Sequence, residues 1–386
     1  MTNEDALSER GPAMVRTGAL RGIEGLPVDV EVDIGSGLPA FIIVGLPDTA
    51  VQEAKERVRA AIRNAGFEFP LRRITVNLAP ADVRKEGPVY DLPIAVAILV
   101  ATGQVPDRFG KDVALFGELS LDGRLRHGAG VLPFVAMCLA QGIGTAIVPV
   151  DDLREVSAVP GIRVLGMATL RQAALNPETW DVPEDAAPSV TSTVQGHDLA
   201  VVQGQEHVKR AIEVAAAGGH NVMMQGPPGS GKTLLARAMP GLLAPLSPAE
   251  AIEVAKVYSV AGLLSRDQPL VGERPFRSPH HTISHAGLVG GGTNIRPGEI
   301  SLAHRGVLFL DEFPEFGAAA LEALREPLEA GAITISRARG SVSFPARFLL
   351  VAAMNPCPCG YYGDSLRSCT CAEGAVSRYQ RRISGR

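Results

Sequence analysis

The segment Gly226-Pro-Pro-Gly-Ser-Gly-Lys-Thr233 has the residue types and spacing of a loop that holds phosphate groups. It matches the pattern G-x-x-x-x-G-K-[ST], in which glycines let backbone N–H groups turn toward a phosphate. In this pattern Lys232 reaches the β- and γ-phosphate oxygens, and the Thr233 hydroxyl binds Mg²⁺. An apolar stretch at 221–225 and a helical pattern at 234–239 predict the strand, loop and helix order that this chemistry requires.

Two further apolar stretches end in polar residues and predict catalytic groups. Residues 306–310 run into Asp311, which could hold Mg²⁺, and Glu312, which could activate a water molecule. Residues 348–354 run into Asn355, which could orient that water. Taken alone, an acidic pair is also typical of a helix N-terminus, and an Asn-Pro step is also typical of a turn. Their positions after a phosphate loop favour the catalytic interpretation.

These patterns define two sets of candidate residues. The predicted catalytic residues are Lys232, Glu312 and Asn355, and Thr233 and Asp311 are the predicted Mg²⁺ ligands. The predicted nucleotide-binding residues are Gly226, Pro227, Pro228, Gly229, Ser230, Gly231, Lys232, Thr233, Leu234 and Asp311.

Four of the five cysteines lie within one short segment. They are Cys357, Cys359, Cys369 and Cys371, in the spacing C-x-C-x₉-C-x-C. Four soft ligands on two short arms suffice for one tetrahedral Zn²⁺ ion with a structural role. A C-x-C arm is tighter than the commoner C-x-x-C, so free thiols or a redox pair remain open alternatives.

Two other polar segments carry weaker signals. His280, His281 and His285 lie close together in the sequence, and we interpret them as exposed or internally satisfied rather than as metal ligands. Alternating residues at 333–344 predict a β-hairpin, at whose tip Arg337 and Arg339 could contact a DNA phosphate backbone. A solvated hairpin tip fits the two arginines equally well.

Composition limits the class of protein. A chain of 386 residues with 46% hydrophobic and 20% charged residues is typical of a folded globular protein with more than one domain. Its net charge of -4 excludes a generally basic surface for nucleic acid. It has no apolar run of about 18 residues and no apolar N-terminal leader, so we expect a cytoplasmic protein with no membrane partner. Residues 181–196, rich in Pro, Ser, Thr and acidic residues, predict a linker.

The N-terminal half alternates β-rich and helical patterns, which predicts an α+β or α/β domain. A helix is expected over about 49–65, beginning at Asp48 or Thr49 and ending at Gly66. Lys55 and Lys85 are expected to be solvated surface charges.

Long motifs make the whole chain similar to one family. They are VDIGSGLPAFIIVGLPD, RITVNLAPADVRKEGP, GPPGSGKTLLARAMPGLL, RPFRSPHHTISHAGLVGGG, RPGEISLAHRGVLFLDEFPEF and AAMNPCPCGYYGD. The chain resembles the ComM/YifB family of magnesium-chelatase-like AAA+ ATPases. The resemblance implies an α/β fold, in which an AAA+ P-loop NTPase core follows a Lon-protease-like α+β domain. It implies ATP and Mg²⁺ as cofactors, a hexameric ring of identical chains, and DNA as a partner.

The resemblance also implies boundaries. We expect a tail at 1–14, a Lon-protease-like domain at 15–180, the linker at 181–196 and the ATPase core at 197–386. The family continues beyond the position of Arg386 into a helical lid, so we expect the core to lack its lid and turnover to be weaker than nucleotide binding. Val89 follows Gly87-Pro88 where the proteases have serine, and 133–140 contains no lysine, so we expect a pseudo-protease that serves assembly or DNA contact.

The motifs predict an ATP hydrolase, and the resemblance implies that it drives DNA branch migration in recombination or natural transformation, with DNA helicase activity. The segment 274–285 is, by the same resemblance, the insert that projects toward the ring pore. Two alternatives stay open: a chelatase ATPase that remodels a partner enzyme, and a nucleotide-binding assembly module with little turnover.

Overall fold

The computed structural model describes residues 12–156, 159–175, 198–264, 272–292, 295–337 and 340–384. The chain divides into two compact units, one formed by 1–189 with 258–270 and the other by 190–257 with 271–386. The predicted linker 181–196 and most of the predicted tail 1–14 lie outside the described residues. The described helices include none that is both long and apolar enough to span a membrane.

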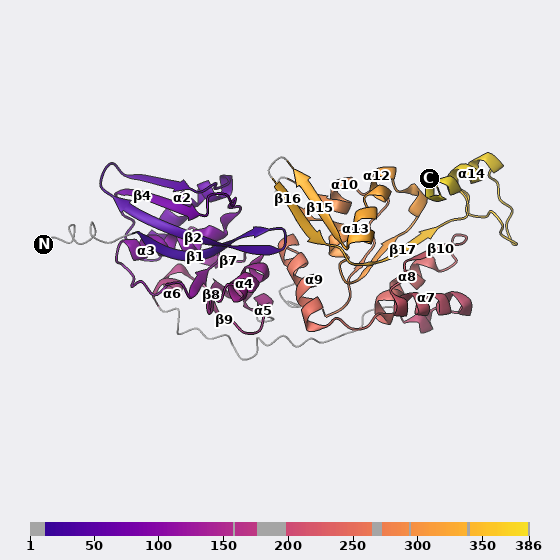
Figure 1. Cartoon of the computed structure of the whole chain (residues 1–386), viewed down its shortest axis with the longest axis horizontal. Coiled ribbons are helices and arrows are strands. Elements are labelled where there is room, and N and C mark those ends of the chain that lie inside the picture. The colour runs from indigo at the N-terminus through magenta and orange to yellow at the C-terminus, as the bar shows by residue number, and fades with distance from the viewer. Residues whose placement is uncertain are drawn as a thin grey trace. The chain divides into compact units, whose positions relative to one another are not determined.

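The first unit is built on a mixed seven-stranded sheet in the order β3-β4-β2-β1-β5-β8-β9 (Figure 1). Its strands are β1 (Ala13–Arg21), β2 (Glu24–Gly35), β3 (Ala40–Val44), β4 (Arg73–Ala79), β5 (Val113–Leu115), β8 (Thr145–Pro149) and β9 (Arg163–Met167), and β6 (Glu118–Leu119) pairs with β7 (Leu125–Arg126). The β1, β2 and β4 pairings are antiparallel, whereas β3 with β4 and the β1-β5-β8-β9 run are parallel. In β2, alternate valines at 28, 30 and 32 are buried, as period-2 patterning requires.

Helices cover both faces of this sheet. They are α2 (Thr49–Asn64), α3 (Asp91–Ala101), α4 (Val131–Ala140), α5 (Leu153–Val156) and α6 (Leu170–Leu175), with short 3₁₀ turns η1 (Pro88–Tyr90) and η2 (Val150–Asp152). The core that contains α2, α3 and α6 includes the β1 side chain of Ala19, whereas Gly18 beside it faces α4. A Cβ at Gly25 would lie 2.5 Å from Met137 Cβ, so glycine lets α4 approach the sheet closely.

The sequence prediction of α2 is confirmed. Asp48 is its N-cap, because the Asp48 carboxylate accepts a hydrogen bond from the Val51 N–H at 2.8 Å. Gly66 follows the helix with a φ of +84°, the left-handed conformation that favours glycine. The prediction for Lys85 is wrong: its side chain is buried, its ammonium donates to the Pro80 carbonyl, and burial lowers its pKa. Lys55 is half-buried on α2.

The second unit has a parallel four-stranded sheet in the order β10-β17-β14-β11. Its strands are β10 (Val222–Gln225), β11 (Phe276–Arg277), β14 (Val307–Leu310) and β17 (Leu349–Met354), and further pairs are β12 (Gly290–Gly291) with β13 (Arg296–Pro297) and β15 (Ala332–Arg337) with β16 (Gly340–Pro345). The antiparallel β15-β16 pair confirms the predicted hairpin.

The remaining elements of this unit are helical. They are η5 (Leu199–Val201), α7 (Glu206–Gly218), α8 (Lys232–Leu242), α10 (His285–Val289), α11 (Glu299–Leu302), η6 (Phe313–Glu315), α12 (Ala318–Glu322), α13 (Arg325–Ala330) and α14 (Glu373–Ser384), together with α9 (Pro248–Ala261) as far as residue 257. One core joins α7 and α8 to apolar residues of β14 and β17, including Phe309 and Val351. Gly306, just before β14, permits a close approach, because a Cβ there would lie 2.0 Å from the Pro275 carbonyl oxygen.

A buried ion pair ties α2 to α3 in the first unit. Asp91, whose side chain is 0% exposed, accepts hydrogen bonds from Arg57 Nε at 2.7 Å and Arg57 Nη2 at 3.0 Å. The Leu119 N–H also donates to this carboxylate, at 3.3 Å. Burial raises the pKa of Asp91 to about 6, while the Arg57 guanidinium opposes that rise.

We predict that Arg57→Ala destabilises the first unit by about 3 kcal/mol, because it leaves the Asp91 carboxylate buried without its cation. Hydrogen exchange of peptides from α3, measured across a series of urea concentrations, gives the free energy of unfolding of the first unit specifically. The matched control is Arg63→Ala, an exposed arginine on the same helix. Equal protection of α3 in the two variants would contradict the prediction.

Candidate nucleotide-binding site

The predicted phosphate loop connects β10 to α8, so the expected strand, loop and helix order is confirmed. Gly229 and Gly231 have φ values of +80° and +82°, which L side chains adopt with difficulty. Gln205, just before α7, donates from Nε2 to the Ser230 carbonyl at 2.6 Å and so supports the loop from outside. The N-terminus of α8 at Lys232 therefore faces the space that the loop encloses, where its dipole favours an anion.

Lys232 is held at the loop by three acceptors. Its ammonium donates to the Gly226 carbonyl at 2.8 Å, the Pro227 carbonyl at 3.0 Å and Asn355 Oδ1 at 3.3 Å. Burial lowers the pKa of Lys232, and the Asp311 carboxylate opposes that shift. The contact with Asn355 brings together two predicted catalytic residues from segments that are far apart in the sequence.

The predicted Mg²⁺ ligands also meet. The Thr233 hydroxyl donates to Asp311 Oδ2 at 3.1 Å, and the Glu312 N–H donates to Asp311 Oδ1 at 2.9 Å. Glu312 has a φ of +53°, a left-handed backbone that is uncommon for a residue other than glycine. Strained backbone of this kind is concentrated at functional sites.

His281 contacts the predicted water-activating residue. Its Nδ1 lies 2.9 Å from Glu312 Oε2, and its ring packs edge-on to Phe316. The interpretation of this histidine as exposed or internally satisfied did not include its contact with Glu312, the predicted water-activating residue. The sequence signal that could have placed His281 near the site was its position shortly after strand β11. That strand has only two residues, which are too few to be recognised by periodicity.

The loop has room and unused polar groups for a phosphate ligand. The Ser230 hydroxyl is buried and has no hydrogen-bond partner among the described residues. A Cβ at Gly229 or Gly231 would meet nothing within 4 Å, so the cradle beside these residues is open. With the Lys232 ammonium and the Thr233–Asp311 oxygen pair, these groups fit a nucleotide phosphate chain with its Mg²⁺ ion.

The other predicted site residues differ in how far the structure describes them. All four cysteines of the 357–371 segment come together, with every pair of Sγ atoms within 4.8 Å. Arg337 ends β15, but the structure describes nothing of its side chain, and Arg339 lies outside the described residues. Their contact with DNA therefore stays a prediction.

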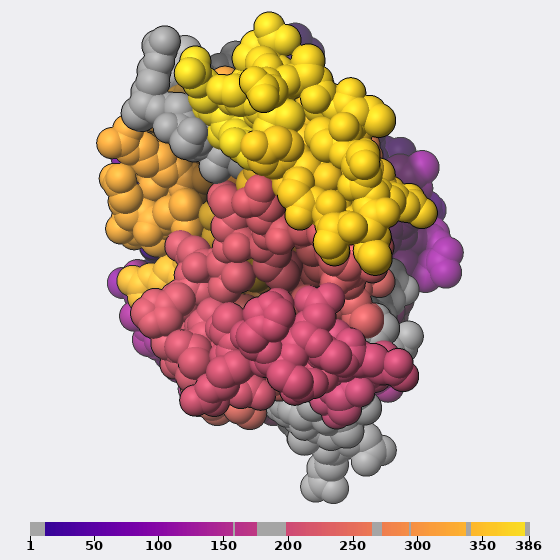
Figure 2. Space-filling view, turned by 90° about the vertical axis from the view of Figure 1, so that its right-hand side faces the viewer, coloured from indigo at the N-terminus to yellow at the C-terminus, as the bar shows by residue number. Residues whose placement is uncertain are grey.

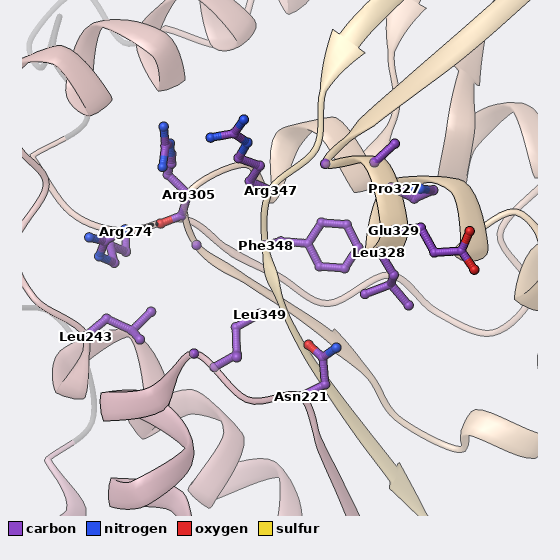
Figure 3. Close-up of a pocket in the computed structure, with 14 residues that line it drawn as sticks. Asn221, Leu243, Arg274, Arg305, Pro327, Leu328, Glu329, Arg347, Phe348 and Leu349 are labelled. Atoms are coloured by element: carbon purple, nitrogen blue, oxygen red, sulfur yellow. Dashed lines mark hydrogen bonds between the residues drawn. The ribbon is translucent and has the colours of Figure 1, made fainter.

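A second hollow lies at the opposite edge of the sheet (Figure 3). This cavity of 540 Å³ is lined at the starts of the strands, by Asn221 before β10 and Leu349 in β17, with Arg274, Arg305 and Arg347 gathered on one side. Arg274 and Arg305 are paired with Glu250, at 3.6 Å and 3.2 Å. Ligands of parallel sheets bind outside the carboxyl ends of the strands, so this cavity is not the nucleotide site.

We predict that Lys232→Ala weakens binding of a fluorescent ATP analogue by about 10- to 150-fold, the cost of losing one hydrogen-bonding partner of a charged ligand. Equilibrium titration in the presence of Mg²⁺ measures the change. Arg237→Ala, which alters an exposed residue on the same helix, is expected to bind like the parent chain. Equal weakening by both substitutions would mean that the ammonium has no specific role.

Comparison with known proteins identifies the family to which the chain is similar. Residues 198–386 match the family described as magnesium chelatase, subunit ChlI, and residues 30–152 match the one described as subunit ChlI of Mg-chelatase. The chain is 46% identical over 374 residues to an uncharacterized protein YifB of Escherichia coli, which covers 97% of this chain and 73% of that protein. It is 44% identical over 383 residues to the competence protein ComM of Haemophilus influenzae, which covers 97% of this chain and 74% of that protein.

Two further relatives extend the comparison. An uncharacterized protein of Mycobacterium tuberculosis is 48% identical over 373 residues, which is 95% of this chain and 73% of that protein. A Lon protease of Geobacter metallireducens is 24% identical over 198 residues, which is 48% of this chain and 24% of the protease. With matches of this extent to YifB and ComM, and with the phosphate loop and its acidic partners in place, the chain belongs to the ComM/YifB family of magnesium-chelatase-like AAA+ proteins.

Proposed function

We propose that this protein binds ATP with Mg²⁺, hydrolyses the ATP, and uses the free energy to move DNA during recombination or natural transformation. The observation that carries the proposal is the meeting of three strand ends, where Thr233 donates to Asp311 and Lys232 donates to Asn355. Glu312 lies next to this meeting point in the chain. A site that only binds nucleotide has no need for an acid and an amide at those positions.

Each residue has a distinct role in the proposal. Lys232 and the loop N–H groups hold the phosphates, while Thr233 and Asp311 supply oxygen atoms for Mg²⁺. The ion, when bound, neutralises charge that develops on the phosphate oxygens. Glu312 accepts a proton from the attacking water, and the Asn355 amide orients that water.

The DNA and ring assignments rest on family membership. The competence protein ComM of Haemophilus influenzae is similar over nearly all of this chain, and its name concerns competence. We propose that this protein likewise works on DNA in the cytoplasm, as a hexameric ring with helicase activity, and that Arg337 and Arg339 contact the DNA backbone. The domain boundaries at 180 and 197 belong to the same proposal.

For the first unit we propose a Lon-protease-like fold without protease activity. A weak similarity to Lon proteases supports the fold. In η1, Val89 follows Gly87-Pro88, and α4 contains no lysine, so an activated nucleophile and its base are both missing from these positions. The unit then serves assembly or DNA contact rather than peptide hydrolysis.

A chelatase role is the second candidate, because both matching families are described by the magnesium chelatase subunit ChlI. In that case ATP turnover would respond to a partner enzyme and not to DNA. A nucleotide-binding module without turnover is the third, and it would bind ATP while leaving it intact. Measurements of binding and of hydrolysis, each with and without DNA, separate the three.

We predict that forked DNA raises the rate of ATP hydrolysis and that Glu312→Gln lowers this rate by about 100-fold or more, because the base that activates water is lost. Binding of the fluorescent ATP analogue should be retained in the same variant. Phosphate release measured with and without forked DNA tests the prediction. A rate of ATP hydrolysis that is the same with and without DNA would contradict the proposed DNA motor. ATP binding without any hydrolysis would favour the nucleotide-binding assembly module.

We predict that His281→Ala raises ATP turnover in the absence of DNA, because the Glu312 carboxylate is then free of the contact that holds it 2.9 Å from His281 Nδ1. The stimulation by DNA should shrink correspondingly. His285→Ala is the matched control, since that exposed histidine begins α10, whereas the His280 ring lies 4.2 Å from the His281 ring. A lower basal rate in His281→Ala would instead show that the histidine orients the carboxylate for catalysis.

A further inference from the structure

Residues 356–372 connect β17 to α14 without forming a helix or strand. Irregular segments longer than about 12–15 residues are uncommon inside a compact domain, because they lack the backbone hydrogen bonds and apolar contacts that fix a chain. This one is nevertheless anchored at both ends, at the catalytic Asn355 and at α14. Something other than regular secondary structure must hold it.

The four cysteine sulfur atoms of this segment occupy one small volume. Cys357 Sγ lies 3.3 Å from Cys359 Sγ and 3.7 Å from Cys369 Sγ, and Cys359 Sγ lies 3.5 Å from Cys369 Sγ. Cys371 Sγ lies within 4.8 Å of the other three. Zinc–sulfur bonds of about 2.3 Å in a tetrahedron place sulfur atoms about 3.8 Å apart, so the cluster needs only small adjustments to surround one ion.

The surroundings of the sulfur atoms favour a metal over disulfides. The Cys359 N–H points to Cys371 Sγ and the Cys371 N–H points to Cys369 Sγ, each at 3.4 Å, so backbone donors stabilise electron-rich sulfur. All four cysteines are free, and the shortest described separation is well beyond a sulfur–sulfur bond of about 2.05 Å. If the four thiols ionise, the resulting thiolates repel one another at these distances. A cation among them removes that repulsion.

The loop packs against the phosphate loop. A Cβ at Gly360 would lie 2.6 Å from Pro228 Cδ, so the two segments are in close contact at this point. Figure 2 shows the C-terminal residues, in yellow, beside the segment that carries α7 and α8. A cavity of 280 Å³ between them is lined by Gly226 and Pro227 on one side and by Gly360, Tyr362 and Asp364 on the other.

The helix α14, which follows the loop, also contacts the edge of the sheet that carries Asn355 and Glu312. Gln380 of α14 donates to the Pro356 carbonyl at 3.3 Å, and Arg382 is paired with Glu315 of η6 at 3.0 Å. The helix that follows the irregular segment therefore contacts Pro356, next to Asn355, and Glu315, near Glu312. Holding the loop in place holds these contacts too.

We propose that Cys357, Cys359, Cys369 and Cys371 bind one Zn²⁺ ion, and that this ion fixes residues 356–372 against the phosphate loop. Zn²⁺ suits four thiolates in a closed tetrahedral site, where it has a structural and not a catalytic role. The two C-x-C arms bring their ligands from both ends of the irregular segment, so one ion closes the loop. Metal binding and the folding of this segment are then one event.

The test measures metal and loop order, neither of which depends on ATP hydrolysis. Elemental analysis of the full chain, purified under reducing conditions with Zn²⁺ supplied, is expected to give one zinc per chain. Cys359→Ser and Cys371→Ser should lose that zinc, whereas Cys138→Ser, which alters the cysteine in α4, should keep it. Removing zinc from the parent chain should speed hydrogen exchange in peptides from 360–368 and leave those from α2 unchanged.

A measurement without substitutions guards against variants that fail to fold. Cobalt(II) added to the metal-free parent chain should give the absorption bands of tetrahedral thiolate coordination. Absence of zinc from the parent chain, another metal in its place, retention of zinc by both serine variants, or a cobalt spectrum without thiolate bands would each overturn the proposal. Hydrogen exchange in peptides from 360–368 that is the same with and without zinc would overturn the proposal that the ion fixes the loop. Zinc without ATP turnover would reject the proposed function and leave this site standing.

Discussion

The parallel register of β10, β17 and β14 is the constraint on which the rest of the second unit depends. Gln225 pairs with Met354, and Leu310 pairs with Ala352, so the residues that follow the three strands emerge at one edge. A shift in register would turn each side chain to the other face of the sheet. The Lys232–Asn355 and Thr233–Asp311 contacts are consequences of this pairing.

The same edge concentrates conformations that are costly on their own. Glu312 has a left-handed backbone, the Ser230 hydroxyl is buried without a partner among the described residues, and the Lys232 ammonium is partly desolvated. Packing of the strands against α7 and α8 provides the stability that offsets the cost of these conformations. We expect this edge to be less stable than the core beneath it, as is usual where ligands bind.

Much of this could be predicted from the sequence because the signals were local. The phosphate loop, the strands that end at Asp311 and Asn355, the hairpin and the capped helix α2 each depend on neighbouring residues. Lys85 was wrongly expected on the surface, because its burial depends on segments that are distant in sequence. The contact of His281 with Glu312 and that of Gln205 with Ser230 likewise join distant segments, which periodicity cannot reveal.

The absence of a side chain at Gly306 allows β11 to pair with β14 and so affects the position of His281. Any Cβ there would collide with the Pro275 carbonyl oxygen and push β11 away from β14. His281 follows β11 in the chain, so the displaced strand would carry its imidazole away from Glu312. A larger residue at Gly306 would therefore disturb the contact between His281 and Glu312 without altering either of those residues.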